Sequence, residues 1–159
     1  MIEPPCLPPS GRCRNGVHIF AARVYYEDTD AGGVVYHTSY LRLAERARTE
    51  MMRSVGFSHG LLLDRHNVLF ALRRCTVDFR FPARLDDALE VRTRVTKVAG
   101  ASIDGHQVIL REGKPLVRVD TTLACMEPRG RPARIPDEVR RALEELCTTE
   151  GSAEEWKAM

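Results

Sequence analysis

Two carboxylates stand two residues apart just before a pair of glycines, and a histidine follows where a helical pattern begins. These residues are Asp28, Asp30, Gly32, Gly33 and His37. A loop that bends at glycine can hold a carboxylate away from solvent, as a general base or a nucleophile. The amino end of a helix offers unpaired N–H groups and a positive dipole end to a developing negative oxygen. The spacing therefore predicts a catalytic acid beside an oxyanion site.

Each of these side chains also has an interpretation without chemistry. Asp30 fits an Asx turn that only shapes the glycine-rich bend, and Asp28 fits a residue that accepts hydrogen bonds to stabilise the loop. His37 alone would be a hydrogen-bonding residue at a helix start. Glu45, further along the helical pattern, is expected to form an ion pair with neighbouring arginines rather than to act as the acid.

Hydrophobic periodicity predicts the elements that position these residues. A long helix is predicted over 38–55, with Thr38 or Ser39 as its cap and Gly56 at its end. A second, shorter helix is predicted at 136–147. The predicted strands are 17–27, 68–82, 89–98, 101–111 and 115–126, the last two joined by a hairpin at 112–114.

One long helix with a wide apolar face needs a cover, and the chain offers no second long helix to supply it. A sheet that curls round the helix does so, which predicts an α+β fold. The single domain is expected to run from residue 17 to 147. Residues 1–16, rich in proline, glycine and arginine, are expected to be a disordered tail, and residues 148–159 a frayed end.

Composition excludes several classes of function. The net charge of +2 gives no reason to expect nucleic-acid binding. No apolar stretch is long enough for a signal peptide or a membrane span, so a cytoplasmic location is expected. Five cysteines without a C-x-x-C pair or a histidine at ligand spacing argue against disulfides and against a metal site. Neither a phosphate-binding loop nor a dinucleotide fingerprint is present, and no cofactor is expected.

The segment E-D-T-D-A-G-G-V-V-Y-H, followed by Y-L-R-L-A-E-R-A-R-T-E, resembles the signature of the hot-dog-fold acyl-CoA thioesterases. It is most similar to the Tol–Pal-associated branch of the 4-hydroxybenzoyl-CoA thioesterase family. The motif covers residues 25 to about 57, and weaker similarity continues to residue 125. The resemblance implies a hot-dog fold, in which an antiparallel β-sheet wraps around one long central helix.

The resemblance also implies roles for individual residues. It makes Asp30 the catalytic acid and the backbone N–H of His37, at the helix start, the donor that polarises the thioester carbonyl. It places Gly33, Val35 and Tyr36 at the substrate. The implied substrate is an acyl-CoA or acyl-carrier-protein thioester, so coenzyme A would be part of the substrate, with Arg73, Arg74 and Arg84 as candidate contacts for its phosphates.

The family implies homodimers that assemble into tetramers, with active sites at subunit boundaries. Two other functions fit such a fold. One is a hot-dog hydratase or dehydratase acting on enoyl thioesters, whose Asp and His usually stand at a different spacing. The other is a non-catalytic scaffold linked to the cell envelope, against which the intact D-x-D-A-G-G argues.

Overall fold

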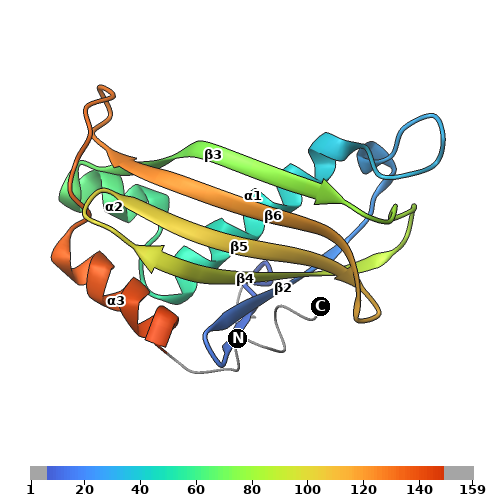
Figure 1. The fold of residues 1–159 in the computed structure, drawn as a ribbon, viewed down its shortest axis with the longest axis horizontal. Coiled ribbons are helices and arrows are strands. Elements are labelled where there is room, and N and C mark those ends of the chain that lie inside the picture. The colour runs from blue at the N-terminus through green and yellow to red at the C-terminus, as the bar shows by residue number, and fades with distance from the viewer. Residues whose placement is uncertain (1–6, 149–159) are drawn as a thin grey trace, which may run out of the picture.

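The computed structural model describes residues 7–148, which form one antiparallel sheet and its helices (Figure 1). The strands are β1 (Arg12–Arg14), β2 (Val17–Arg23), β3 (Leu69–Phe79), β4 (Ala88–Val98), β5 (Ser102–Arg111) and β6 (Lys114–Met126). The helices are the 3-10 turn η1 (Tyr26–Asp28), α1 (His37–Ser54), α2 (His59–His66) and α3 (Asp137–Thr148). The order across the six-stranded sheet is β1-β2-β4-β5-β6-β3.

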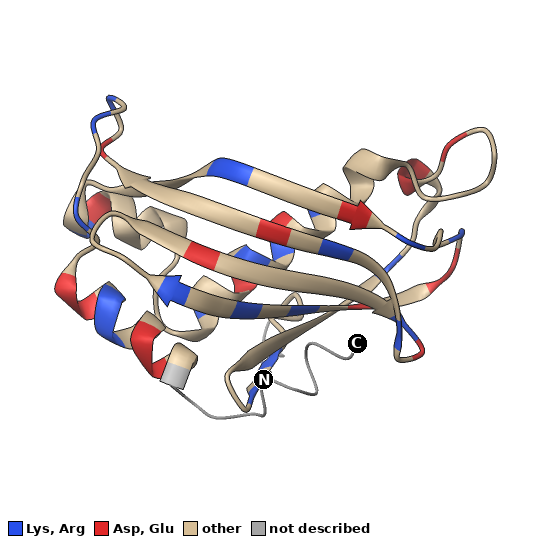
Figure 2. Ribbon diagram, viewed as in Figure 1, with Lys and Arg blue, Asp and Glu red and all other residues tan. Residues whose placement is uncertain are grey.

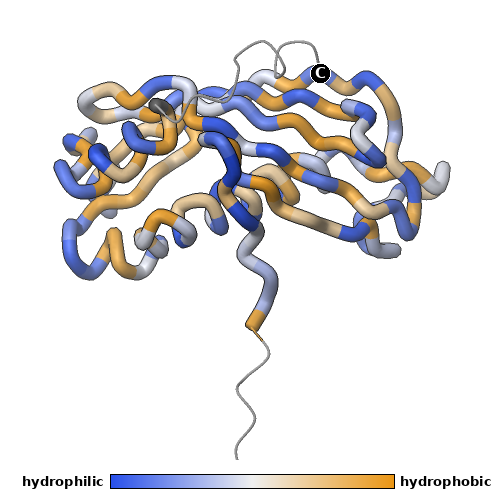
Figure 3. The backbone as a smooth tube through the Cα atoms, turned by 90° about the horizontal axis from the view of Figure 1, so that it is seen from below, coloured by the Kyte–Doolittle hydropathy of each residue, from blue (hydrophilic) through white to orange (hydrophobic). Residues whose placement is uncertain are grey.

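Helix α1 runs along one face of the sheet, as Figure 1 shows, and charged residues are spread along the strands (Figure 2). Its inward stripe includes Tyr40, Leu43, Ala44 and Ala47, all buried. Strand β4 alternates strictly in its first half: Leu89, Val91, Thr93 and Val95 are buried and the residues between them are not. The same alternation is visible along the strands in Figure 3. The predicted hot-dog fold is confirmed.

The apolar core has two parts, one at each end of α1. The first surrounds the beginning of the helix and includes Tyr40 and Leu43 with residues of β2, β4 and β6. The second surrounds its end, where Met51 and Met52 pack with residues of α2, α3 and β5. The start of α1 therefore packs mainly on strands of the sheet, whereas its end also packs on α2 and α3.

A buried polar cluster ties the middle of α1 to the sheet. Arg48 donates from Nη1 to the Gln107 side chain over 2.7 Å, and the Gln107 amide donates to the Ala44 carbonyl and to the Thr93 hydroxyl, both over 2.9 Å. Arg48 also pairs with Glu45, as the sequence predicted for that acid. Buried hydrogen bonds of this kind fix the helix in one position on the sheet.

Strand β3 contains a β-bulge. Leu72 pairs with Leu123 of β6 and Arg74 pairs with Thr122, so Arg73 is the extra residue. Phe70 and Leu72 before the bulge share the helix-facing side with Cys75, Val77 and Phe79 after it, since residues of both groups pack on the core or line a hollow beside α1. A bulge adds one residue without turning the strand over.

The prediction of a disordered tail through residue 16 is wrong for the part that the structure describes. Residues 12–14 form β1, which pairs with β2 in register Arg12 to Ile19. Asn15 and Gly16 both have positive φ, 49° and 73°, as in a two-residue type I′ hairpin turn. The Asn-Gly pair was the available signal. Residues 1–6 and 149–159 lie outside the described residues.

Three further features differ from the prediction: the end of one strand, the start of the long helix, and a short helix that was not expected. The strand predicted at 17–27 ends at Arg23, because the chain turns into η1. Helix α1 begins at His37 with Tyr36 as its cap residue, and no side chain caps it, contrary to the expected Thr38 or Ser39. Helix α2 was not predicted, although its ends carry ordinary signals: Ser58 accepts from the Leu61 N–H, and Asn67 adopts a left-handed conformation.

Candidate active site

The loop that leads into α1 is held by its own backbone. The Asp30 N–H donates to the Val34 carbonyl over 2.9 Å, and the Gly33 N–H donates to the Asp30 carbonyl over 3.0 Å. On its far side the Val35 N–H donates to the Ala83 carbonyl over 2.9 Å, which ties the loop to the segment after β3. The bend is therefore rigidly attached to the sheet on one side of the site.

Asp30 stands at the tip of this bend and is exposed. Its Oδ1 accepts from the Gly32 N–H over 2.8 Å and, more weakly, from the Val34 N–H over 3.4 Å. The side chain thus forms the Asx turn that was the alternative interpretation, and in the single copy it is not held away from solvent as the sequence suggested. Only one oxygen is used in this way, so Oδ2 remains available for chemistry.

The two glycines serve different needs. A Cβ on Gly32 would lie 3.1 Å from Asp30 Oδ1, so the close approach of carboxylate and backbone favours glycine there. Gly33 has φ +74°, a left-handed conformation that costs other residues about 1–2 kcal/mol. Both glycines shape the loop around the acid. Gly33, predicted to contact substrate, does not line the pocket beside the helix start.

Asp28 has the structural role predicted for it. It is buried, and its Oδ2 accepts from the Tyr25 N–H over 2.9 Å. The Tyr36 N–H donates to its carbonyl over 2.8 Å. Asp28 therefore joins the beginning of the loop to the residue before α1, and its carboxylate is committed to the backbone.

The start of α1 is open on the side of the loop. The Ser39 N–H donates to the Tyr36 carbonyl over 2.8 Å. Because no side chain caps the helix, the N–H groups of His37 and Thr38 are left for another acceptor. His37, the first helical residue, has an exposed side chain that packs against Tyr36, with 4.3 Å between the ring centroids and the rings tilted by 53°. Its ring also meets Phe79 edge-on at 6.5 Å. The orphan donors and the positive dipole end coincide with the predicted oxyanion site.

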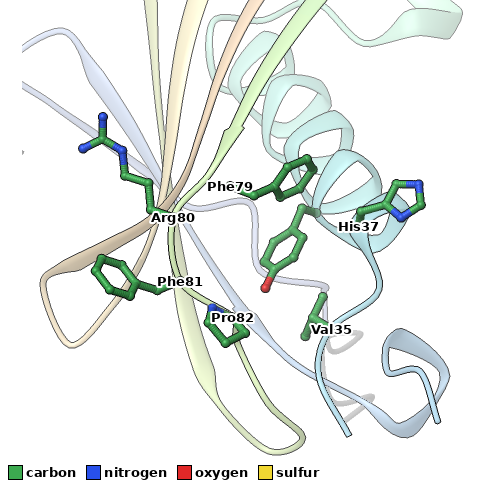
Figure 4. A pocket seen from close by; sticks show the side chains of 7 residues that line it. Val35, His37, Phe79, Arg80, Phe81 and Pro82 are labelled. Atoms are coloured by element: carbon green, nitrogen blue, oxygen red, sulfur yellow. The ribbon is translucent and has the colours of Figure 1, made fainter. Parts of the chain in front are cut away.

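A hollow of about 260 Å³ opens beside this helix start (Figure 4). Its lining residues are Val35, His37, Tyr40, Phe79, Arg80, Phe81 and Pro82. Figure 4 shows Phe79 turned toward the helix and Arg80 turned away from it. The sequence predicted two of these residues, Val35 and His37. The others come from the end of β3 and from within α1, and no local pattern marked them.

Tyr40 fixes the floor of the hollow. Its hydroxyl accepts from the Ala83 N–H over 2.8 Å, which attaches α1 to the segment after β3. Burial raises the pKa of this phenol above its ordinary value, against the opposing hydrogen bond from Ala83. Tyr40 is therefore a neutral structural hydroxyl at physiological pH, and the site has no phenolate.

Cations stand around the outer rim of the hollow. Lys114 Nζ lies 3.7 Å from the centre of the Phe81 ring, and Arg80 pairs with Asp78 over 2.7 Å. Arg84 is exposed on the neighbouring turn, where the chain forms a bridge with Val34. Arg84 is thus near the loop, as expected of a phosphate contact. Arg73 and Arg74 lie at the bulge of β3, away from the residues that line the hollow.

Between residues 7 and 148, the acids, histidines and cysteines form no group of three that could hold a metal ion. In the same range, no helix combines the length and apolarity needed to cross a membrane.

Comparisons with known proteins agree with this geometry. Residues 24–143 match the model of the "Thioesterase-like superfamily". The chain is 41% identical over 128 residues to "Acyl-CoA thioesterase YbgC" of Haemophilus influenzae, covering 80% of this chain and 94% of that protein. It is 44% identical over 119 residues to "Acyl-CoA thioester hydrolase YbgC" of Escherichia coli O6:H1, covering 74% and 88%. A probable thioesterase from Bartonella henselae is 37% identical with a TM-score of 0.73, over 76% of this chain and 99% of that structure.

A sheet curled round one helix is the hot-dog fold, and the relatives at 41–44% identity make this chain a hot-dog thioesterase. The chain belongs to the thioesterase-like superfamily, as its motif indicated.

Proposed function

We propose that the chain hydrolyses an acyl-CoA thioester to the free acid and coenzyme A, with Asp30 as general base or nucleophile and the His37 backbone N–H as oxyanion donor. The predicted class of enzyme, an acyl-CoA thioesterase, is confirmed by relatives at 41–44% identity. The residue roles are the proposal. The observation that supports these roles is that Asp30 uses only Oδ1 in the turn and stands on the loop that leads into α1, whose start has no side-chain cap.

In the base-catalysed version, Asp30 Oδ2 takes a proton from water and the hydroxide attacks the thioester carbonyl carbon. The carbonyl oxygen becomes negative and is stabilised by the His37 N–H and the helix dipole. The carbon–sulfur bond then breaks, and the thiolate leaves with the proton that Asp30 holds. In the nucleophilic version, Oδ2 attacks the carbon itself, the carbon–sulfur bond breaks and the coenzyme A thiolate leaves. Water then hydrolyses the mixed anhydride, which releases the acid, regenerates the Asp30 carboxylate and supplies the proton that the thiolate takes up.

The hollow beside His37 suits the part of the substrate that surrounds the thioester. Its lining of Val35, Phe79, Phe81 and Pro82 is apolar, and Tyr36 flanks it through His37. The cations at the rim suit the phosphates of coenzyme A, with Arg84 and Lys114 as exposed candidates. A carrier-protein thioester, which presents the same arm without the nucleotide, is the alternative form of the substrate.

We also propose that the working form is a homodimer, doubled to a tetramer, in the cytoplasm. The edge strand β3 is 11 residues long and carries exposed apolar side chains, Leu72 at 49% and Phe79 at 50% exposure. A long free edge is a place where a second copy pairs. The four described cysteines are free, which suits a reducing compartment. No observation favours the hydratase or the envelope-linked scaffold over hydrolysis.

The test is a matched pair of variants, assayed by release of free coenzyme A. Asp30→Asn keeps the size and the turn-forming oxygen, so it should fold and assemble normally while kcat falls by ~10²–10⁴. Asp28→Asn replaces a buried charged acceptor of the Tyr25 N–H by a neutral amide, which weakens that hydrogen bond, so its kcat should fall less and its stability more. Near wild-type hydrolysis by Asp30→Asn would sink the assignment, and the reverse ranking would transfer it to Asp28.

A further inference from the structure

The chain forms a tight turn over residues 84–87, after Pro82 of the hollow and just before β4 begins. The Asp87 N–H donates to the Arg84 carbonyl over 3.2 Å, and the Arg84 N–H donates back to Asp87 Oδ2 over 2.8 Å. Asp86, between them, has φ +68°, a left-handed conformation. A residue other than glycine keeps such a conformation when its surroundings hold it there.

One support of this turn is Arg111, the last residue of β5. Its Nη1 donates to the same oxygen, Asp87 Oδ2, over 2.6 Å, and both side chains are half-buried. Burial alone would raise the pKa of Asp87, but the hydrogen bonds from Arg111 and from the Arg84 N–H hold that pKa below its ordinary value. The two side chains therefore form a charged pair at neutral pH, partly shielded from solvent.

The turn is also attached to the end of β2. The Asp86 N–H donates to the Val24 carbonyl over 3.1 Å, and the Val24 N–H donates to the Asp87 carbonyl over 2.9 Å. Arg23 Nη1 donates to the Asp86 carbonyl over 2.9 Å. Val24 is buried in the core. The turn is thus held from β2 by Arg23 and Val24 and from β5 by Arg111.

Ala83, directly before the turn, joins the two sides of the active site. It is buried, its N–H donates to the Tyr40 hydroxyl over 2.8 Å, and its carbonyl accepts from the Val35 N–H over 2.9 Å. The first bond reaches the helix that begins with His37, and the second reaches the loop that carries Asp30. A shift of Ala83 would therefore change the spacing between the acid and the helix start.

Arg84 extends this connection to the acid itself. It forms a bridge with Val34, and the Val34 carbonyl accepts from the Asp30 N–H over 2.9 Å. The Arg84 N–H is the group that the Asp87 carboxylate accepts from. Two links therefore separate Asp87 from the acid-bearing loop, although neither Asp87 nor Arg111 lines the hollow of the candidate site.

From these contacts we infer that Asp87 and Arg111 are positioning residues for thioester hydrolysis. Their ion pair fixes the turn at 84–87, and this turn holds Asp30 in place relative to the His37 N–H. The inference rests on the proposed function. It assigns no substrate contact to either residue, so loss of the pair should lower kcat with little change in KM. A displacement of about 1 Å at a reacting group can cost about a hundredfold in rate.

The first measurement compares variants on octanoyl-CoA or benzoyl-CoA, whichever the wild type hydrolyses faster. Arg111→Met removes the charge but keeps an unbranched side chain, and we expect kcat to fall about tenfold to a hundredfold while KM changes less than about threefold. Asp87→Asn should show the same division between kcat and KM, and Arg111→Lys should recover part of the loss. Arg140→Met is the matched control, because Arg140 holds another turn through the Ala99 carbonyl over 2.7 Å, and its kcat should be unchanged.

The second measurement tests whether the pair acts through Asp30. In the Asp30→Asn background, Arg111→Met should change kcat by less than about twofold, because the group that the pair positions is already lost. An equal loss of kcat in both backgrounds would overturn the positioning role. A rise in KM at unchanged kcat would overturn it as well and make Arg111 a substrate contact. So would a loss of kcat in Arg140→Met as large as that in Arg111→Met.

The same variants separate this inference from the proposed function. If Asp30→Asn hydrolyses its substrate like the wild type, the proposed function fails, and the inference fails with it. If Asp30→Asn is impaired while Arg111→Met and Asp87→Asn keep the wild-type kcat, the proposed function stands and only the positioning role is refuted.

Discussion

The two edge strands of the sheet, β1 and β3, differ in whether the rest of the chain covers them. At one edge β1 has three residues, two of them arginines, and the chain before it turns back so that the Ser10 carbonyl accepts from the buried His18 ring over 2.8 Å. At the other edge β3 runs for 11 residues without a cover, and the hollow beside His37 borders its end. The first edge is closed by its own chain, whereas the second is free for the proposed pairing with another copy. The candidate site and the proposed contact therefore lie on the same, open side.

The change with the largest expected effect on stability removes the closed edge, strand β1. A chain that starts at Val17 loses β1 and leaves the buried His18 ring without its acceptor, so its free energy of unfolding should fall by about 1–3 kcal/mol. Light scattering should show the same oligomer for this chain and for the full-length protein. A monomer in both cases would refute the shared site, and assembly that depends on residues 1–16 would reverse the assignment of the edges.

Gly11 and Gly33 have similar φ angles, but their replacement by alanine should affect stability and activity differently. Gly11 has φ +79°, and a Cβ there would lie 2.4 Å from the Ile19 carbonyl oxygen, whereas Gly33 has φ +74° and open space. Gly11→Ala should lower the free energy of unfolding by about 1–2 kcal/mol, and at most by as much as the deletion of residues 1–16 does, with kcat unchanged. Gly33→Ala should cost about 1 kcal/mol but lower kcat, because it reshapes the turn around Asp30. Urea unfolding and steady-state kinetics on both variants provide the measurement.

The closed edge should also respond to pH. Burial lowers the pKa of His18 below its ordinary value, against smaller opposing effects of the Ser10 carbonyl and of Glu50. The unfolded chain then binds more protons, so this contribution to stability is full above pH about 6.5 and is lost as the pH falls below it. Urea unfolding between pH 5 and 8 should show this slope, and His18→Gln should flatten it. An equal slope in the variant would assign it to other groups.

The smallest expected effect concerns the thiols and metals. Burial raises the pKa of Cys75, Cys125 and Cys147, which keeps these thiols protonated and slow to react. Cys13 is exposed but lies on β1, at the closed edge. Hydrolysis should therefore survive iodoacetamide under native conditions, and it should also survive a chelator. Complete loss after removal of a metal would refute the metal-free mechanism.

Local patterns in the sequence predicted most of the fold. The alternation of β4 and the apolar stripe of α1 were legible because each element buries one face. Helix α2 escaped because eight residues contain barely two turns of periodicity, and β1 escaped because an arginine-rich strand of three residues shows none. In both cases only the turn residues, Ser58 with Asn67 and Asn15 with Gly16, carried information.

The candidate site was predictable only where it is continuous in the sequence. The motif supplied Asp30, His37 and Val35, but it could not supply Phe79 to Pro82, which reach the helix start through the pairing of β3 with β6. The exposure of Asp30 was also beyond prediction, because it depends on whether a second copy covers the loop. Contacts between distant segments are set by topology, and a single sequence records topology weakly.

The single extra residue, Arg73, shifts the alternation of inward and outward side chains along β3 by one position. Side chains alternate with a period of two, so removing that residue would turn Cys75, Val77 and Phe79 toward the charged outer face. Phe79 would then leave the hollow beside His37, and Cys75 and Val77 would leave the core. A deletion of one exposed arginine, far from any reacting atom, would thus remove one wall of the candidate site.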